Sequence, residues 1–380
     1  MKKPEVLILG AGLMGRVVAY YFLHHADGPY SVRLADSCDV TLKHAEQWLN
    51  SNDVESVIVD VEDSVSLMKA LDGVKVCSSC VPYFLNPEIA IACLKAGVSF
   101  VDLGGNPEVT DQILNLDEAA KAAGISLIPD TGLAPGLGSI LAWELASRFQ
   151  QCDEVHIRVG GLPQQPTGPL KYAQFFSMHG LLNEYLEDAR EIRDGQEVAV
   201  PSLEELETLT IEGEGEFEAF ITSGGTSTTT KTMLGKVNRL DYKTIRYPGH
   251  CAKLQLLRDL GLTNTQQLTF ENGFTSPREM LARVLERHLP QNAPDVVYVV
   301  ATATGDHGQQ ERMNIIIRQD ETRGISAMGQ GTSFPSAAIA RAILIGNVPP
   351  GAHAQETVIG YDYMKAELHN MGIEIIEQSV

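Results

Sequence analysis

Residues 6–15 read VLILGAGLMG, an apolar stretch that runs into glycines at Gly10, Gly12 and Gly15. The apolar part predicts a buried strand, and the following LMGRVVAYYFLHH is typical of a helix. In this context Gly10 permits a tight turn, Gly12 lets a pyrophosphate approach the backbone, and Gly15 lets helix and strand pack closely. The first N–H groups of the helix would face the phosphates. The stretch therefore predicts a dinucleotide-binding domain at the start of the chain.

An acidic residue follows at the spacing that this motif requires. The next strand, SVRLAD, ends in Asp36, about 20 residues beyond the last glycine. A carboxylate there accepts hydrogen bonds from ribose hydroxyls and repels a 2′-phosphate, and the following SCDV adds an acid but no arginine. The expected cofactor is therefore NAD. Further cofactor contacts are expected at Leu13, Met14, Val81 and Pro82.

The first third of the chain alternates strand and helix patterns. Six strand candidates are EVLILG, SVRLAD, VESVIVDV, VKVCSSCV, VSFVDLG and ISLIPDTG, and helix-like stretches separate them, the last being ILNLDEAAKAAG. Parallel strands need long crossovers, which helices supply. The fold class predicted is α/β, with a doubly wound parallel (Rossmann) sheet.

Beyond residue 130 the pattern changes to that of a mixed α+β domain. Strands are expected at EVHIRVGG, EFEAFITS, DVVYVVATAT, RMNIIIRQ and RGISAMGQ, the last two as an antiparallel hairpin, and helices at GLLNEYLEDAREIRDG and SPREMLARVLERHL. SFPSAAIARAILIG, with a Ser and Pro start signal, is expected to return the chain to the first sheet. The predicted domains are residues 1–130 plus 331–380, and the inserted residues 131–330. The acidic stretch Glu187–Glu218 is expected to be a solvated face.

Composition narrows the classes of partner. A formal net charge of −20 argues against nucleic acid and anionic membranes, which attract positively charged proteins. No apolar run approaches the roughly 18 residues of a membrane span, so a cytoplasmic location is expected. Cys77 and Cys80 form a CxxC pair without a second ligand pair, and no metal site is expected.

One short segment departs from the acidic balance. Residues 243–250 read KTIRYPGH, and the window 231–258 around them holds seven Lys or Arg residues and one acid, Asp241. This imbalance predicts an anion-binding surface, with Arg246 as a planar fork for a carboxylate and Tyr247 and His250 beside it. Tyr83, in the loop CVPYF after a strand, is a second candidate for contact with substrate.

Several long stretches resemble a known family. IPDTGLAPGLGSILA, GGLPQQPTGPLKY, SMHGLLNEYLEDAREIRDG, LDYKTIRYPGH and GTSFPSAAIARAILIG, together with the N-terminal glycine motif, are similar to the saccharopine dehydrogenase superfamily and most similar to its lysine 6-dehydrogenase branch. The resemblance implies a dinucleotide-binding domain interrupted by a substrate-binding and dimerisation domain, and hence a homodimer. Saccharopine-using relatives tend to carry an arginine where this chain has His179, which favours a smaller amino acid.

The activity implied by the resemblance is an NAD-dependent amine dehydrogenase acting on CH–NH2 or CH–NH donors. It would oxidise the ε-amine of L-lysine to 2-aminoadipate 6-semialdehyde with release of ammonia. His179, His250 and Tyr83 are the catalytic candidates, and Arg246 and Tyr247 the substrate-binding ones. The alternatives are a saccharopine dehydrogenase or a polyamine-pathway enzyme that joins an amine to a carbonyl, and an NAD-binding sensor without turnover.

Overall fold

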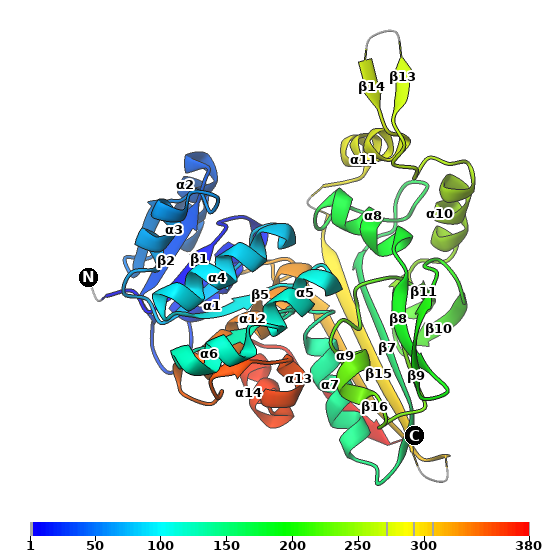
Figure 1. Cartoon of the computed structure of the whole chain (residues 1–380). Coiled ribbons are helices and arrows are strands. Elements are labelled where there is room, and N and C mark those ends of the chain that lie inside the picture. The colour runs from blue at the N-terminus through cyan, green and yellow to red at the C-terminus, as the bar shows by residue number, and fades with distance from the viewer. Residues whose placement is uncertain (1–2, 271–272, 292, 306–307, 380) are drawn as a thin grey trace. The chain divides into compact units, whose positions relative to one another are not determined.

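The protein, as a computed structural model, is described over residues 3–270, 273–291, 293–305 and 308–379, and it divides into two compact units (Figure 1). Unit 1 contains the chain up to Ser147 together with Ser227–Met233 and Gly329–Ile375. Unit 2 contains Arg148–Thr226, Leu234–Met328 and the last strand. Helix α7 (Leu137–Ser147), which the sequence placed in the inserted domain, therefore belongs to unit 1.

Unit 1 is built on a seven-stranded parallel sheet in the order β17-β6-β5-β4-β1-β2-β3. Its strands are β1 (Val6–Leu9), β2 (Val32–Asp36), β3 (Val54–Ile58), β4 (Val76–Ser79), β5 (Ser99–Asp102), β6 (Ser126–Ile128) and β17 (Gly351–Ala352). The first six are the predicted ones, which confirms the doubly wound fold. Strand order reverses between β1 and β4, and a ligand site is expected beyond the carboxyl ends of these two strands.

The helices of unit 1 lie where crossovers require them, with two differences from prediction. They are α1 (Leu13–Leu23), α2 (Asp39–Leu49), α3 (Ser64–Leu71), η1 (Tyr83–Leu85), α4 (Asn86–Ala96), α5 (Pro107–Leu114), α6 (Asp117–Ala123), α7, α9 (Thr229–Met233), α13 (Gln355–Val358) and α14 (Tyr361–Asn370). The segment ILNLDEAAKAAG is not one helix, since α5 ends at Leu114 and α6 begins at Asp117. Helix α12 (Ala327–Leu344) begins before the predicted Ser-Pro start, and Pro335 lies inside it.

Unit 2 contains a nine-stranded mixed sheet and a separate two-stranded ribbon that stands out from α11 (Figure 1). The main path is β10-β11-β12-β7-β15-β16-β18, with β8 paired to β12 and β9 paired to β8. The elements are β7 (Cys152–Pro163), α8 (Met178–Leu186), β8 (Ala189–Arg193), β9 (Gln196–Val200), β10 (Glu207–Ile211), β11 (Gly215–Ile221), β12 (Arg239–Arg246), α10 (His250–Asp259), β13 (Leu268–Phe270), β14 (Gly273–Thr275), α11 (Pro277–His288), β15 (Asp295–Gly305), β16 (Gln310–Arg318) and β18 (Ile376–Ser379).

Strand β12 has two chemically different faces because successive side chains of a strand alternate. Tyr242 and Arg246 lie on the face next to an apolar cluster formed by the segment around Tyr172 with α8, α10 and α11. On the opposite face Asp241 lies beside Arg158 of β7 in a buried ion-pair network. The face with Tyr242 and Arg246 is a candidate binding site, and the face with Asp241 stabilises the sheet through its ion pairs.

Two predicted elements of unit 2 are wrong. GLLNEYLEDAREIRDG is not a single helix: α8 ends at Leu186, and Ala189–Arg193 form β8, where Ala189 and Ile192 are buried in the sheet. RGISAMGQ is not a strand paired to RMNIIIRQ, because β16 pairs instead with β15 and β18. The carboxylate of Asp295 accepts hydrogen bonds from the first N–H groups of α12, and this cap starts a helix there.

The acidic stretch from Glu187 to Glu218 is not uniformly solvated either. Glu218 is buried and accepts hydrogen bonds from Gly249 N (2.7 Å) and Cys251 N (2.6 Å) at the start of α10. Glu191 is also buried, and Arg193 donates to it at 2.8 Å. A buried carboxylate is tolerated where such charge-assisted hydrogen bonds replace water.

In the part of the chain that the structure describes, no helix is both long and apolar enough to cross a bilayer.

Candidate functional site

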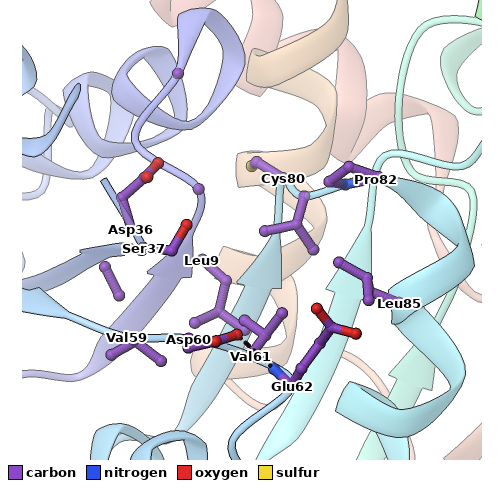
Figure 2. Close-up of a pocket in the computed structure, with 14 residues that line it drawn as sticks. Leu9, Asp36, Ser37, Val59, Asp60, Val61, Glu62, Cys80, Pro82 and Leu85 are labelled. Carbon is purple, nitrogen blue, oxygen red and sulfur yellow. Dashed lines mark hydrogen bonds between the residues drawn. The ribbon is translucent and has the colours of Figure 1, made fainter. Parts of the chain in front are cut away.

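A cavity of about 280 Å³ lies in unit 1 at the carboxyl ends of the central strands (Figure 2). It is lined by Leu9, Gly10, Gly12, Ala35, Asp36, Ser37, Val59, Asp60, Val61, Glu62, Cys80, Val81, Pro82 and Leu85. These residues follow β1, β2, β3 and β4, so the cavity lies at the reversal of strand order where a dinucleotide binds in such sheets. Sequence reasoning missed Val59 to Glu62, although their position directly after a strand is a signal for this edge.

The glycine motif adopts the geometry that its spacing predicts. Gly10 has φ +93°, a conformation that other residues rarely adopt, and a Cβ there would lie 2.8 Å from Cys80 O. A Cβ on Gly15 would lie 1.8 Å from Gly10 O, so only glycine lets α1 approach β1 this closely. A Cβ on Gly12 would meet no protein atom within 4 Å. Gly12 therefore keeps open space for something other than the protein, as a phosphate-binding glycine should.

Asp36 is fixed by the backbone on both sides. Ala11 N donates to its Oδ2 at 2.8 Å, and Cys38 N donates to its Oδ1 at 2.8 Å. Its remaining lone pairs can accept hydrogen bonds from ribose hydroxyls. Asp60 and Glu62 line the same cavity, and no lysine or arginine is among the described residues that line it. The described lining of the cavity therefore carries three carboxylates and no basic side chain.

Substitution by alanine should affect cofactor binding at Gly12 and stability at Gly15, because the two glycines have different surroundings. We expect Gly12→Ala to fold normally but to bind the dinucleotide at least tenfold more weakly, because the new methyl group would occupy the phosphate position (an order-of-magnitude estimate). Gly15→Ala should instead lower the free energy of unfolding by about 1 to 3 kcal/mol or more, because its methyl group collides with backbone. Fluorescence titration and thermal unfolding of both variants measure the difference. Equal loss of stability in the two would contradict these assignments.

The four remaining predicted cofactor residues differ in their surroundings. Val81 and Pro82 line the cavity. Leu13 is exposed in the first turn of α1, and Met14 accepts a hydrogen bond from Ser333 Oγ at its carbonyl oxygen. Leu13 and Met14 do not line the cavity. Tyr83 begins η1, and its side chain packs on Gly105, where an added Cβ would lie 3.0 Å from Tyr83 Cβ and 3.1 Å from its ring atom Cδ1.

Two buried carboxyl groups lie at the ends of β5 and β6. Asp102 Oδ1 accepts hydrogen bonds from Gly104 N (2.7 Å) and Asp130 N (3.1 Å). Asp130 Oδ2 accepts one from Thr110 Oγ1 at 2.8 Å and another from Ser227 Oγ. Burial raises the pKa of both carboxyl groups, and for Asp130 the charge of Asp102 raises it further. The pair orders the two loops at this edge of the sheet.

In unit 2 the basic segment KTIRYPGH forms the end of β12, a turn, and the start of α10. Gly249 precedes the helix with φ +89°. Tyr247 points away from Arg246, since its hydroxyl donates to Pro163 O at 2.8 Å and its ring contacts Phe217. The structure therefore brings Arg246 and His250 together but not Tyr247.

Arg246 is the centre of a buried hydrogen-bonded chain. Its Nε donates to Tyr185 Oη at 2.8 Å and its Nη1 to Ile245 O at 2.9 Å, and its guanidinium carbon lies 4.9 Å from the centre of the Tyr172 ring. Among the described residues, none accepts a hydrogen bond from Nη2. The side chain is 3% exposed, so this open N–H group lies in a nearly water-free place where an anion would bind strongly.

His250 completes that chain as a neutral ring. Its Nδ1 lies 2.8 Å from Leu170 O and its Nε2 lies 3.0 Å from Tyr185 Oη. Burial and the charge of Arg246 lower the pKa of His250 to about 3. A neutral ring donates from Nδ1 to the carbonyl and accepts from the tyrosine hydroxyl at Nε2. Such a histidine orients Tyr185, and through it Arg246, rather than taking up a proton at neutral pH.

His179 has a different environment. It lies in the first turn of α8 with its side chain 55% exposed, and its Nε2 lies 3.6 Å from Glu279 of α11. Sequence reasoning missed Glu184, Tyr185 and Tyr172, the residues that surround Arg246. A signal for the first two was present, because they lie on the predicted helix that begins directly after His179. Nothing in the sequence indicated which face of that helix would meet β12.

No group of three or more metal-ligating side chains occurs among the described residues. The structure thus offers a dinucleotide cavity in unit 1 and, in unit 2, a buried arginine with an open N–H group.

Comparison with known proteins agrees with this division. The family model described as the saccharopine dehydrogenase NADP binding domain matches residues 6–128, and the one described as the saccharopine dehydrogenase C-terminal domain matches residues 132–374. A nicotinamide cofactor is therefore supported. The resemblance to the superfamily is confirmed, and the lysine 6-dehydrogenase branch stays a prediction.

Individual relatives are distant. The chain is 26% identical over 273 residues to a mitochondrial alpha-aminoadipic semialdehyde synthase of Bos taurus, covering 69% of this chain and 29% of that protein. It is 23% identical over 356 residues to saccharopine dehydrogenase (NADP+, L-glutamate-forming) of Schizosaccharomyces pombe, covering 87% of this chain and 73% of the relative. The chain thus spans less than a third of the length of the bovine relative.

Two solved structures share the fold. Saccharopine dehydrogenase (L-Glu forming) from Saccharomyces cerevisiae aligns with a TM-score of 0.79 at 18% identity, covering 99% of this chain and 100% of that one. A homospermidine synthase from Legionella pneumophila, in complex with NAD, aligns with a TM-score of 0.70 at 13% identity, covering 100% of this chain and 92% of that one. At these identities the likeness concerns the fold.

Proposed function

Since the chain belongs to the saccharopine dehydrogenase family, we propose that it is an NAD-dependent amine dehydrogenase that oxidises the ε-amine of L-lysine. The observation that carries the proposal is Arg246, a buried guanidinium with an open Nη2, which suits the carboxylate of an amino acid. The turn at Gly249 and the chain through Tyr185 to His250 hold this arginine in one geometry, so little entropy is lost on binding.

The proposed reaction converts lysine, NAD and water into 2-aminoadipate 6-semialdehyde, ammonia and NADH. The ε-ammonium first loses a proton, so that the nitrogen lone pair can expel hydride from the ε-carbon. Bound NAD supplies the hydride acceptor. Water then hydrolyses the imine and releases ammonia. Of the two histidine candidates, His179 has a solvent-exposed side chain that can exchange a proton with water, whereas His250 is buried and held neutral.

A second candidate is a saccharopine dehydrogenase, in keeping with the names of the relatives. A specific observation favours it: Arg278 of α11 is half-buried and its Nη2 donates to Asn183 Oδ1, next to Glu184 on α8. This arginine would take the place of the one that His179 replaces, and would hold the additional carboxylates of saccharopine. The two candidates therefore differ in what Arg278 does.

Initial rates of NADH formation separate the two. With wild type we expect turnover of L-lysine, and we expect Arg278→Gln to leave the KM for lysine within about twofold, since lysine has no second carboxylate for it (an order-of-magnitude estimate). Turnover of saccharopine alone, with a KM that rises in Arg278→Gln, would favour the second candidate. A protein that binds dinucleotide but oxidises neither compound would instead be the sensor considered at the outset.

The choice of NAD over NADP is part of this proposal, and its support is the acidic cavity around Asp36. We expect wild type to prefer NAD, and Asp36→Ala combined with Ser37→Arg to shift the NAD to NADP preference toward NADP by roughly tenfold or more, because a repelling charge becomes an attracting one. Titration with NADH and NADPH measures the ratio. An unchanged ratio would remove Asp36 from the cofactor site. We also propose that the protein forms a homodimer and that its substrate is an amino acid.

A further inference from the structure

Glu184 is a carboxyl group without a hydrogen-bond donor. It lies on α8 directly before Tyr185, the residue that binds Arg246 Nε at 2.8 Å. Glu184 is half-buried, and no described residue donates a hydrogen bond to its carboxylate. Burial raises the pKa of Glu184 to about 7, against the opposing effect of Arg246. A half-buried carboxylate to which no described residue donates remains able to accept hydrogen bonds from a ligand.

Arg246 and Glu184 are close enough to influence each other's ionisation, yet no direct ion pair joins them in the described part of the chain. Arg246 donates hydrogen bonds from Nε to Tyr185 Oη and from Nη1 to Ile245 O, and no described residue accepts one from Nη2. Arg246 thus offers a buried N–H group and Glu184 a half-buried carboxylate of opposite charge, and no described residue forms a hydrogen bond with either Nη2 or that carboxylate. A ligand with a negative and a positive group side by side would complete both at once.

We propose that Arg246 and Glu184 form a clamp for the α-amino acid end of the substrate, with the guanidinium binding the α-carboxylate and the Glu184 carboxylate binding the α-ammonium. The inference rests on the proposed function in taking an amino acid as substrate, and it adds which end of that amino acid unit 2 holds. The ligand class is an L-α-amino acid whose side chain stays free to react. Lysine and saccharopine both have such an end, so the clamp serves either candidate reaction.

The clamp predicts a definite order among ligands that differ by one group. L-Lysine has both groups, 6-aminohexanoate lacks the α-amine, and 1,5-diaminopentane lacks the α-carboxylate. Isothermal titration of the full-length protein should find L-lysine the tightest, with each deletion costing roughly 10- to 100-fold, the usual worth of one charge-assisted hydrogen bond. L-Saccharopine, titrated in parallel, should bind if the protein prefers the larger substrate.

Variants assign the α-ammonium to Glu184. We expect Glu184→Gln to weaken L-lysine roughly 10- to 100-fold and to leave 6-aminohexanoate unchanged, since that ligand has no α-amine for Glu184 to bind. Asp188→Asn is the control. It removes an exposed carboxylate close to Glu184 in sequence but not part of the clamp, and it should change the affinity for neither L-lysine nor 6-aminohexanoate. Thermal unfolding of each variant checks that the fold is retained.

The pH dependence provides a second readout. The charged and titratable groups around Glu184 are Arg246 and Tyr242 of β12, Tyr185 of α8, Tyr172, and Arg278 of α11, which donates to the neighbouring Asn183. Burial raises the pKa of the three tyrosines above its ordinary value and raises that of Glu184 to about 7. Only the ionised carboxylate binds an ammonium, so affinity for L-lysine should fall about tenfold from pH 8 to pH 6, and this slope should vanish in Glu184→Gln.

The outcomes separate the clamp from the proposed reaction. Lysine binding that needs Glu184, without NADH formation, would keep the clamp and refute lysine oxidation. NADH formation from lysine with wild-type affinity in Glu184→Gln would keep the reaction and overturn the clamp. Failure of both L-lysine and L-saccharopine to bind, or equal loss of 6-aminohexanoate in the variant, would also overturn it.

Discussion

Arg246→Lys should bind L-lysine about 100-fold more weakly than wild type, with a matching rise in KM. The substituted side chain retains a positive charge, but it lacks the planar guanidinium that can donate hydrogen bonds to Tyr185 and to a substrate carboxylate at the same time. A charge-assisted hydrogen bond in such a buried place is worth about 1.5 to 3 kcal/mol, which corresponds to roughly 10- to 150-fold in affinity. Isothermal titration gives the affinity, and initial rates give the KM.

A matched control for this prediction lies in the same basic window, residues 231–258. Arg258, on α10, bonds at the surface to Asp259 at 3.1 Å and to Glu204 at 3.3 Å. Arg258→Lys should leave substrate affinity unchanged, because its partners accept an ammonium as readily as a guanidinium. If Arg246→Lys bound lysine as tightly as wild type while remaining folded, Arg246 would not be part of the binding site.

Asp241→Asn should be the most destabilising of the substitutions considered on the opposite face of β12. Asp241 is 1% exposed; Arg158 Nη1 donates to it, His156 Nδ1 lies 3.0 Å away and Arg239 Nε lies 3.3 Å away. Neutralising it leaves a buried guanidinium without one of its counter-charges. We expect a loss of about 3 kcal/mol, the lower end for a broken buried pair, because Glu207 still binds Arg158 at 2.5 Å.

The pH dependence of that loss follows from two shifted groups. Burial opposes ionisation of Asp241, but the neighbouring His156, 3.0 Å away, and the charge of Arg158 outweigh it, so the pKa of Asp241 lies well below its usual range. A depressed pKa contributes stability above the unfolded value near 4 and loses it as pH falls further. The pKa of His156 is raised, against the effect of its burial, by the adjacent carboxylate of Asp241. A raised pKa contributes fully below about 6.5 and loses its contribution as pH rises.

The stability gap between wild type and Asp241→Asn should therefore be widest between about pH 4 and 6.5. Urea unfolding at several pH values measures it. Glu154→Gln is the control: Glu154 also pairs with His156, at 3.1 Å, but its side chain is 41% exposed, and its loss should change stability little. A gap that stayed constant from pH 3 to 9 would show that the network does not depend on these charges.

Local signals in the sequence were sufficient for the first six strands of unit 1. The glycine motif and the alternation of strands and helices depend on neighbouring residues, so they predict β1 to β6 and the position of Asp36 directly. Unit 2 depends more on contacts that are distant in sequence. Residues 189–193 have a helix-like composition, but pairing with β9 and β12 makes them a strand.

The candidate site shows the same limit. Local excess of positive charge pointed to Arg246, and that residue proved to be buried beside His250. The sequence could not indicate that Glu184 of α8 approaches β12, because helix periodicity leaves several faces open until the packing partner is known. It also suggested that acids between Glu187 and Glu218 face solvent, whereas Glu218 caps α10. Charge patterns locate surfaces better than they locate buried partners.

The measurement that tests the central claim most directly is the stoichiometry of ammonia and NADH formed from L-lysine by the purified full-length protein with NAD. The account predicts one ammonia for each NADH, because the ε-imine is hydrolysed after hydride leaves. NADH formation from saccharopine alone, with glutamate and no ammonia as products, would contradict lysine oxidation and establish the second candidate.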